Sequence, residues 1–255
     1  MNFIGAIIGD INGSVYEFHN HRSKKFSLLN KSMFWTDDTV LTIAIMDCLL
    51  HKKDCAKTLK EWANEYLFCS WGGSFYKWLH DDSSKPYNSF GNGAAMRVSP
   101  VGFIAKSEEE VKQLSDMVTG VTHNHEEGLK GAYVTAMCVF YARNGKSKDE
   151  IKHFVEQYYN IDFDYNELKA HYWFNETCQD TVPQAIYCFL ISKNFEDCIR
   201  TSISIGGDSD TLAAISCSIA GAYYGIPQKL VDKAVDFLPL KMIKILQEFK
   251  EAIGE

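Results

Sequence analysis

The sequence predicts an all-α protein, a single orthogonal helical domain over residues 1–255. Three observations predict this fold class. Only five prolines occur, apolar residues recur mostly at spacings of three and four, and alternating strand patterns are scarce. The best strand candidate, residues 202–205, is only four residues long. One domain is expected because no glycine- or serine-rich linker and no block of charge marks a boundary.

Apolar spacing and capping signals place the helices along the chain. The first two patterns lie after Asp38 and around residues 59–67. Ser107 and Ser147 each stand three positions before a glutamate, which predicts capping boxes that open two helices. Further helices are expected at 126–142, 182–192, 195–203, 211–224, 228–237 and 240–251, and loops at 19–34, 70–74, 81–93, 143–146 and 160–180.

Composition and charge exclude several classes of protein. Hydrophobic residues make up 46% and charged residues 23%, which excludes a disordered or collagen-like chain. The net charge of −7 disfavours non-specific nucleic-acid binding. No stretch approaches 18 apolar residues, so no membrane partner is expected. The eight cysteines contain no CxxC pair and are expected to be buried free thiols. We expect a cytoplasmic monomer without a signal peptide or a stable nucleic-acid partner.

Two acidic tetrads are the main candidates for chemistry. Thr36-Asp37-Asp38-Thr39 and Asp208-Ser209-Asp210-Thr211 align position for position, and each precedes an apolar helix. Either tetrad alone is consistent with simple helix capping. Together they offer four carboxylates and several hydroxyls, which suit Mg²⁺ or Mn²⁺ rather than zinc. If both face one cleft, they predict a two-metal site, because four carboxylates without a cation would repel one another.

Three weaker signals accompany the tetrads. Gly91-Asn92-Gly93 is either a plain turn or a backbone cradle for an anion or pyrophosphate. His123 is either a packed loop residue or a ligand for a ribose hydroxyl or phosphate. Glu17 is either solvated or functional. Residues 145–147 resemble the end of a Walker A motif, but Phe140 occupies the position that requires the first glycine. We therefore predict no Walker A motif here.

These motifs, taken in order, resemble the ADP-ribosylglycohydrolase family. The resemblance runs from near the N-terminus to about residue 227, and the ordered set is specific although each motif alone is weak. The matching stretches are residues 5–17, Thr36-Asp37-Asp38-Thr39, Gly91-Asn92-Gly93-Ala94-Ala95-Met96-Arg97, Thr122-His123, Gly206-Gly207-Asp208-Ser209-Asp210-Thr211 and residues 220–227.

The resemblance implies an all-α fold with a central binuclear metal cleft that holds two Mg²⁺ or Mn²⁺ ions. Glu17 matches a glutamate on the family's mobile flap, and Asp38 and Glu17 are the candidates for the catalytic base. The implied metal ligands are Thr36, Asp37, Asp38, Asp208, Asp210 and Thr211. The implied substrate-binding residues are Ser89, Phe90, Gly91, Asn92, Gly93, Met96 and His123.

The implied activity is metal-dependent hydrolysis of the bond between ADP-ribose and a side chain of a modified protein. Cleavage at C1″ of the distal ribose would pass through an oxocarbenium-like transition state. Residues 13–17 and 181–190 resemble the branch that cleaves O-linked ADP-ribose, such as that on serine. The alternatives are an N-linked ADP-ribosyl-arginine hydrolase, a non-catalytic ADP-ribose-binding module and, least favoured, a metal-dependent phosphohydrolase. The chain is short and its 160–180 loop is compact compared with those of better-studied relatives. The loops that determine selectivity in those relatives are therefore expected to be missing here.

Overall fold

The computed structural model, which describes residues 1–255, consists of helices joined by loops and has no β-sheet. Gly91 and Thr177 form only an isolated bridge. The all-α prediction is confirmed, and a phosphohydrolase built on a doubly wound parallel sheet is excluded. The helices are η1 Asn2–Ile4, α1 Gly5–Gly13, α2 Asp37–His51, α3 Cys55–Glu65, α4 Gly73–Leu79, α5 Gly93–Met96, α6 Ser99–Ile104, α7 Glu108–Thr119, α8 Glu126–Arg143, α9 Lys148–Val155, α10 Tyr165–His171, α11 Cys178–Ile191, α12 Phe195–Ser204, α13 Ser209–Tyr224, α14 Gln228–Val235 and α15 Leu240–Ile253.

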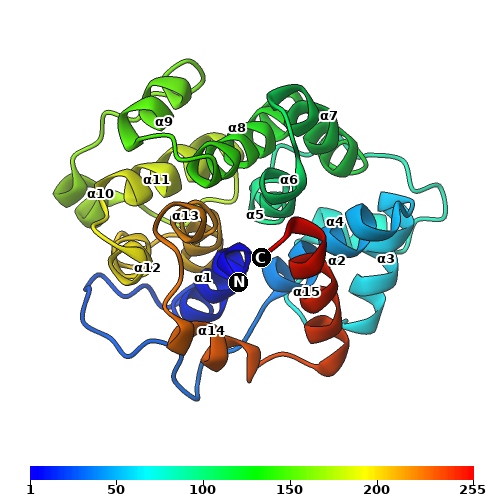
Figure 1. Ribbon diagram of the computed structural model, residues 1–255, viewed down its shortest axis with the longest axis horizontal. Helices are drawn as coiled ribbons and strands as arrows, with labels where there is room; N and C mark the ends of the chain where they lie inside the picture. The colour runs from blue at the N-terminus through cyan, green and yellow to red at the C-terminus, as the bar shows by residue number, and fades with distance from the viewer.

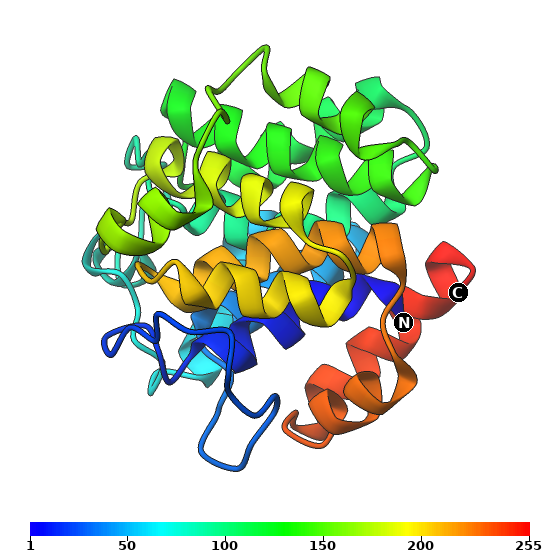
Figure 2. The same cartoon turned by 90° about the vertical axis from the view of Figure 1, so that its left-hand side faces the viewer.

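Helices α1 and α13 lie side by side at the centre of the molecule (Figures 1 and 2). Helices α8, α11 and α12 pack against α13, while α2 packs against α1 and is backed by α3 and α15. Every residue of α1 is buried, as are residues 209–221 of α13. Helix α13, which begins with the second acidic tetrad, and helix α1 beside it are therefore fixed in position by the surrounding core.

A stripe of glycines lets α1 and α13 touch backbone to backbone. Gly5, Gly9 and Gly13 recur every four residues and so share one face of α1. A Cβ at Gly5 or Gly9 would lie 2.1 Å from a carbonyl oxygen of α13. A Cβ at Gly13 would lie 2.3 Å from the Cα of Asp210. No side chain larger than hydrogen fits, so this stripe sets the distance between α1 and the start of α13.

We expect the substitution Gly13→Ala to lower the free energy of unfolding by about 3 kcal/mol, the upper end of the range for overpacked cores. The new methyl group meets backbone atoms, which cannot rotate away. Urea unfolding followed by circular dichroism measures the change. Gly73→Ala is the control, because a Cβ there meets nothing within 4 Å. Equal stability of the two variants would contradict the close packing.

Most predicted helices are found with ends shifted by a few residues, and the tetrads do begin α2 and α13. Ser147 forms a full capping box with Glu150. Ser107 caps α7, but Glu110 accepts a hydrogen bond from the backbone of Lys106 instead of Ser107, so the second predicted box is incomplete. Pro183 lies inside α11, which begins four residues earlier than predicted.

Two local predictions are wrong. The predicted loop 160–180 contains α10, whose N-terminus is capped by Asp164 and which buries no residue. Residues 202–205 are not a strand but the end of α12, where Ser202 and Ser204 donate to carbonyl oxygens four and three residues earlier. These bonds satisfy the serine hydroxyls within the helix, so the serine–isoleucine alternation carries no strand signal.

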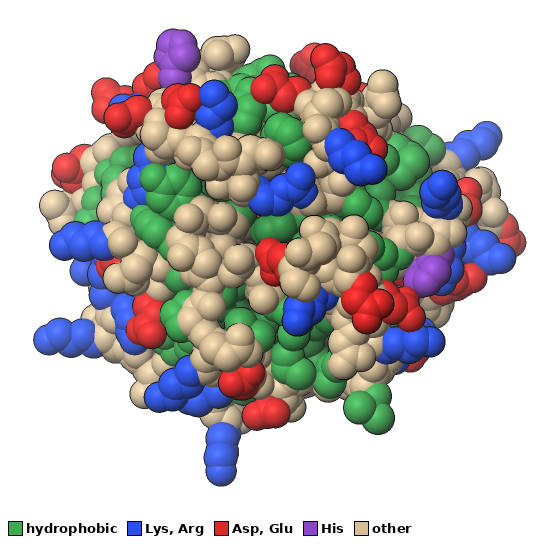
Figure 3. Space-filling view, in the orientation of Figure 1, with side chains coloured by type: hydrophobic (Ala, Val, Ile, Leu, Met, Phe, Trp, Pro, Cys, Tyr) green, Lys and Arg blue, Asp and Glu red, His purple; other side chains and the backbone are tan.

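The surface and the cysteines agree with the composition. Figure 3 shows acidic and basic side chains interspersed over one face of the molecule. None of the helices is both long enough and apolar enough to cross a bilayer. All eight cysteines are free, and only Cys69 is not fully buried.

Candidate active site

A polar cleft of about 230 Å³ lies where the starts of α2 and α13 meet the segment around α5. Six of its lining side chains are carboxylates, one is a guanidinium and only four are hydrophobic. The structure brings together every predicted site residue except Thr36 and Phe90. The predicted residues that line the cleft are Glu17, Asp37, Asp38, Ser89, Gly91, Asn92, Gly93, Met96, His123, Asp208, Asp210 and Thr211.

The start of α2 is held by Asp10, a fully buried residue of α1. Its carboxylate accepts hydrogen bonds from the backbone N–H groups of Thr36 and Thr39, at 3.0 and 3.1 Å, and from both threonine hydroxyls. These four bonds fix the turn on which Asp37 and Asp38 stand. Sequence reasoning missed Asp10 as a site residue, although it lies within the motif stretch 5–17.

Thr36 and Phe90 lie outside the cleft lining. The Thr36 hydroxyl donates to Asp10 at 2.8 Å and accepts from the Asp38 N–H at 3.2 Å, so it caps α2 and keeps one lone pair unused. The Phe90 side chain is exposed and its ring lies 5.2 Å from that of His125. The capping interpretation of the first tetrad is therefore correct for Thr36, whereas the two following aspartates face the cleft.

The second tetrad begins α13 without a side-chain cap. Gly206 and Gly207 have φ of +79° and +75°, a conformation that favours glycine and turns the chain into the helix. Asp208 occupies the N-cap position, but its side chain caps no helical N–H. One of its oxygens instead accepts from the Asn92 amide at 2.7 Å. Capping therefore does not explain Asp208, whose carboxylate lines the cleft.

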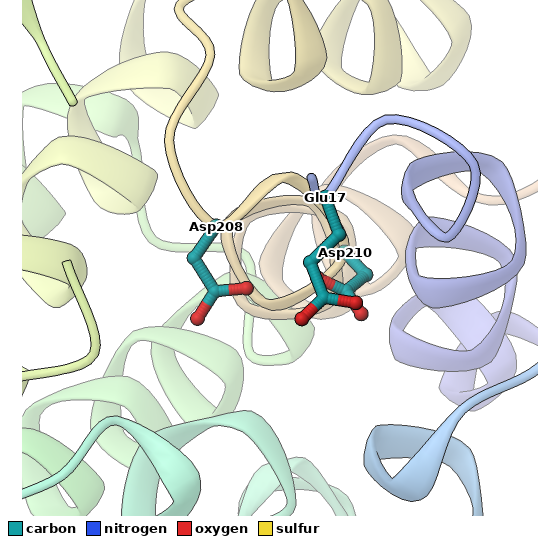
Figure 4. A group of neighbouring side chains, drawn as sticks. All are labelled: Glu17, Asp208 and Asp210. Atoms are coloured by element: carbon teal, nitrogen blue, oxygen red, sulfur yellow. The ribbon is translucent and has the colours of Figure 1, made fainter. Parts of the chain in front are cut away.

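Glu17 joins this cluster from the chain that follows α1. The carboxylates of Glu17, Asp208 and Asp210 each offer an oxygen within 4.8 Å of the others, and Figure 4 shows all three pointing to the same side. The Asn20 side-chain amide forms two hydrogen bonds with the backbone of Gly207. Its NH₂ group donates to the Gly207 carbonyl, and its oxygen accepts from the Gly207 N–H, each at 2.8 Å. The segment after α1 that carries Glu17 and Asn20 is therefore tied to the loop that carries Asp208.

Burial, and after it the crowding of carboxylates, raises the pKa values of the acidic groups in the cleft. Burial, reinforced by Asp210 and Asp10, raises the pKa of Asp37 to about 8. Burial and the charges of Asp210 and Asp37 raise the pKa of Glu17 to about 9. Burial followed by neighbouring carboxylates also raises the pKa of Asp38 and of Asp210 well above the usual range. Asp38 is nevertheless bonded, since the Thr211 hydroxyl donates to it at 3.1 Å.

The glycine-containing segment forms the opposite wall of the cleft. The Asn92 N–H donates to the Glu176 carbonyl at 2.7 Å, and the Gly91 N–H donates to the Ser89 hydroxyl at 3.1 Å. Of the predicted cradle, only the Gly93 N–H has no acceptor within the protein. Two of the three N–H donors therefore hold the loop in place, as the plain-turn interpretation expects, and the cradle interpretation is left with the Gly93 N–H alone.

The ADP-ribosylglycohydrolase family model matches residues 2–252. The chain belongs to this family. The protein is thus an ADP-ribosylglycohydrolase, an enzyme that hydrolyses the glycosidic bond of ADP-ribosylated substrates. The alternative of a non-catalytic ADP-ribose-binding module is set aside by this relationship.

Relatives of this ADP-ribosylglycohydrolase cover nearly its whole length. The ADP-ribosylhydrolase ARH3 of Mus musculus is 27% identical, over 88% of this chain and 83% of that protein. The ADP-ribosyl-[dinitrogen reductase] glycohydrolase of Rhodospirillum rubrum is 24% identical, over 88% and 84%. A solved structure of an ADP-ribosylglycohydrolase-related protein complex superposes with a TM-score of 0.74 at 22% identity, covering 99% of this chain and 96% of that one.

The cleft of this ADP-ribosylglycohydrolase also contains residues that sequence reasoning missed. Arg97 ends the matching stretch Gly91–Arg97 and could have been found from it, and Tyr87 lies four residues before that stretch. Glu176 belongs to the segment predicted only as a loop. The remaining additions come from other elements and carried no sequence signal: Leu41, Ser70, Gly72, Gly73, Ser74 and Phe75.

Proposed function

We propose that this enzyme uses two divalent cations, Mg²⁺ or Mn²⁺, to release ADP-ribose from an O-linked acceptor such as serine on a modified protein. The observation that supports cation binding is the convergence of six carboxyl side chains in one cleft that contains a single guanidinium. A diphosphate substrate would be repelled by such a cleft unless cations neutralised it. The family membership supports the hydrolytic reaction.

The residues present fit hard cations, since every donor is oxygen. Asp37 and Asp38 from α2 and Asp208, Asp210 and Thr211 from α13 would hold them, and the unused lone pair of Thr36 adds a further donor. Bound there, the cations would supply positive charge and Lewis acidity that orient and polarise the oxygen atoms of the distal ribose.

The protein's own groups would do the remaining work. Glu17 and Asp38 lie where a carboxylate can orient a water molecule and accept its proton, which is general base catalysis. Asn92 is bonded to Asp208 and so helps to keep that carboxylate in place. The cleft is smaller than the roughly 300–1,000 Å³ of usual ligand pockets, which supports enclosure of the distal ribose and diphosphate, with the adenosine toward the rim.

Two acceptors are compared by experiment. The resemblance of residues 13–17 and 181–190 to the O-linked branch supports serine. The exposed carboxylate of Glu176 at the cleft favours a cationic acceptor, arginine, as the second candidate. Release of free ADP-ribose is measured from peptides modified on serine and on arginine, with Mg²⁺ and with EDTA. Faster release from serine is expected. Faster release from arginine would overturn the linkage, and no release from either would overturn the proposed activity.

The substitution Glu17→Gln is expected to reduce single-turnover cleavage by about 10²–10⁴-fold, the usual contribution of acid–base assistance. Bound cations would favour the ionised form of Glu17 despite its raised pKa. Glutamine keeps the shape of the side chain and removes its capacity to accept a proton. ADP-ribose affinity, measured by calorimetry, should change much less, because the wall around Asn92 and His123 is intact. Glu176→Gln is the control and should lose less than tenfold. Equal losses of binding and cleavage would make Glu17 a ligand contact, and unchanged cleavage would make it a solvated flap residue.

A further inference from the structure

Behind the glycine wall of the cleft lies a buried chain of polar groups, formed by Arg97, Thr122 and His123. Arg97 is 1% exposed, His123 is 5% exposed and Thr122 is fully buried. None of the three belongs to the proposed cation ligands. Both Arg97 and His123 also line the cleft, so the chain of groups connects the core to the space that the substrate would occupy.

The direction of each hydrogen bond follows from the donors available and from the charge of Arg97. Arg97 can only donate, and its Nη2 lies 2.6 Å from the Thr122 hydroxyl oxygen. The single hydroxyl proton of Thr122 then has two possible acceptors. His123 Nδ1 lies at 2.8 Å and the carbonyl oxygen of Thr119 at 3.4 Å. The 2.8 Å contact is a hydrogen bond in either tautomer of the ring. An oxygen that already accepts from a cationic donor, however, makes its own O–H a stronger donor and is a weaker acceptor for a second N–H. Nδ1 of His123 is therefore the acceptor, and the ring proton is on Nε2.

Nε2 of His123 faces the glycine segment. A Cβ at Gly93 or Gly91 would lie only 3.4 or 3.5 Å from this nitrogen. The absence of side chains at both positions leaves space in front of the N–H group. No protein group accepts a hydrogen bond from Nε2, so this donor is left for a molecule in the cleft.

The same arrangement keeps the ring uncharged. Burial, followed by the positive charge of Arg97, lowers the pKa of His123 well below its usual range. Arg97 has no carboxylate within 4 Å, and its Nε and Nη1 have no hydrogen-bond partner. Its positive charge is therefore not neutralised by a salt bridge and disfavours a second positive charge on His123.

We propose that Arg97 and Thr122 are positioning residues that hold His123 in the neutral Nε2–H form, so that the ring donates a hydrogen bond to an oxygen of the bound ADP-ribose. This inference rests on the proposed function for the identity of the ligand. The form of the ring does not depend on it, because the hydrogen bonds that set it are present without substrate.

The tautomer of His123 is measured first, in the ligand-free enzyme, by ¹⁵N nuclear magnetic resonance of the histidine side chains. His123→Gln assigns the signal by its disappearance. A pyridine-type Nδ1 and a pyrrole-type Nε2 are expected. The reverse pattern would overturn the proposal, whether or not ADP-ribose proves to be the ligand.

Binding of ADP-ribose by calorimetry is measured next. Thr122→Val removes the hydroxyl at nearly constant shape. We expect the His123 ring to lose its preference for the Nε2–H tautomer and ADP-ribose to bind about tenfold more weakly, the effect of one lost hydrogen bond. Thr122→Ser should retain both. Thr119→Val is the matched control, because that buried hydroxyl has no partner.

The outcomes separate the two hypotheses. If Thr122→Val keeps the wild-type tautomer and affinity, the positioning role is overturned. If Thr122→Val does not fold, loss of the tautomer preference in Thr122→Ser, which keeps the hydroxyl, would also overturn it. If the wild-type enzyme shows the expected tautomer but no ADP-ribose binding, the proposed substrate fails and the positioning by Arg97 and Thr122 stands.

Discussion

Asp38→Ala and Asp210→Ala are each expected to reduce turnover by at least about 10³-fold at saturating Mg²⁺, because each removes a charged group from the centre of the acidic cleft. The fold should survive in both variants. In the metal-free protein these carboxylates are buried among like charges, so losing one relieves repulsion. We therefore expect melting temperatures in EDTA that equal or exceed that of the wild type.

Asp149→Ala provides the matched control for this experiment. It makes the same change in net charge at an exposed position in the first turn of α9, away from the cleft. Turnover and the response to Mg²⁺ should be unchanged. If Asp210→Ala or Asp38→Ala keeps near wild-type turnover under saturating metal, that aspartate serves only the helix start and the proposed cation site is wrong.

The metal-free enzyme is expected to melt at lower temperature as pH rises from about 5 to about 9. Burial raises the folded-state pKa of Asp10 and Asp208 to about 6, and that of Asp37 to about 8, from 3.8. A raised pKa means that the folded state binds more protons than the unfolded state. The resulting stability is fully present below about pH 4 and is lost as pH rises through the folded-state values.

The expected size is large. One pKa unit corresponds to about 1.4 kcal/mol, so the shift of Asp10 alone corresponds to about 3 kcal/mol, or a change on the order of 10 °C in melting temperature. Mg²⁺ or Mn²⁺ should raise the melting temperature more at pH 9 than at pH 6, because cations and protons compete for the same oxygens. Thermal melts with EDTA or metal measure both effects. A pH-independent melting temperature in EDTA, or full activity after exhaustive chelation, would contradict the cation hypothesis.

The sequence predicted the fold class and most of the cleft because both depend on local patterns. Apolar spacing located the larger helices, and the ordered motifs named residues that do meet at one cleft. Helix α1 was not predicted, since its three glycines are poor helix formers in isolation and are used only in contact with α13. Asp10 was overlooked for a related reason, because its four hydrogen bonds join residues that are more than 25 positions apart.

Other features depend on geometry that no local pattern encodes. Arg97 stood inside a quoted motif, but its unpartnered nitrogens and its contact with Thr122 exist only in the folded protein. The sequence Gly91-Asn92-Gly93 is consistent with an anion cradle. In the folded protein, however, the Asn92 N–H donates to the backbone carbonyl of Glu176, which lies in a loop distant in sequence. In each case the role of the residue depends on a hydrogen bond to a residue that is distant in sequence.

The contact between α1 and α13 also affects how the chain can fold while it is being synthesised. Helix α1 is synthesised before α13 and carries Ile7, Ile8 and Ile11, all fully buried in the finished protein. Its partner follows about 200 residues later, which at about 5–20 residues per second is a delay of roughly 10–40 s. During that time the glycine face has nothing to pack against. The cleft therefore cannot assemble stepwise on the nascent chain, and a chain that stops before residue 209 lacks the helix that closes both the core and the acidic site.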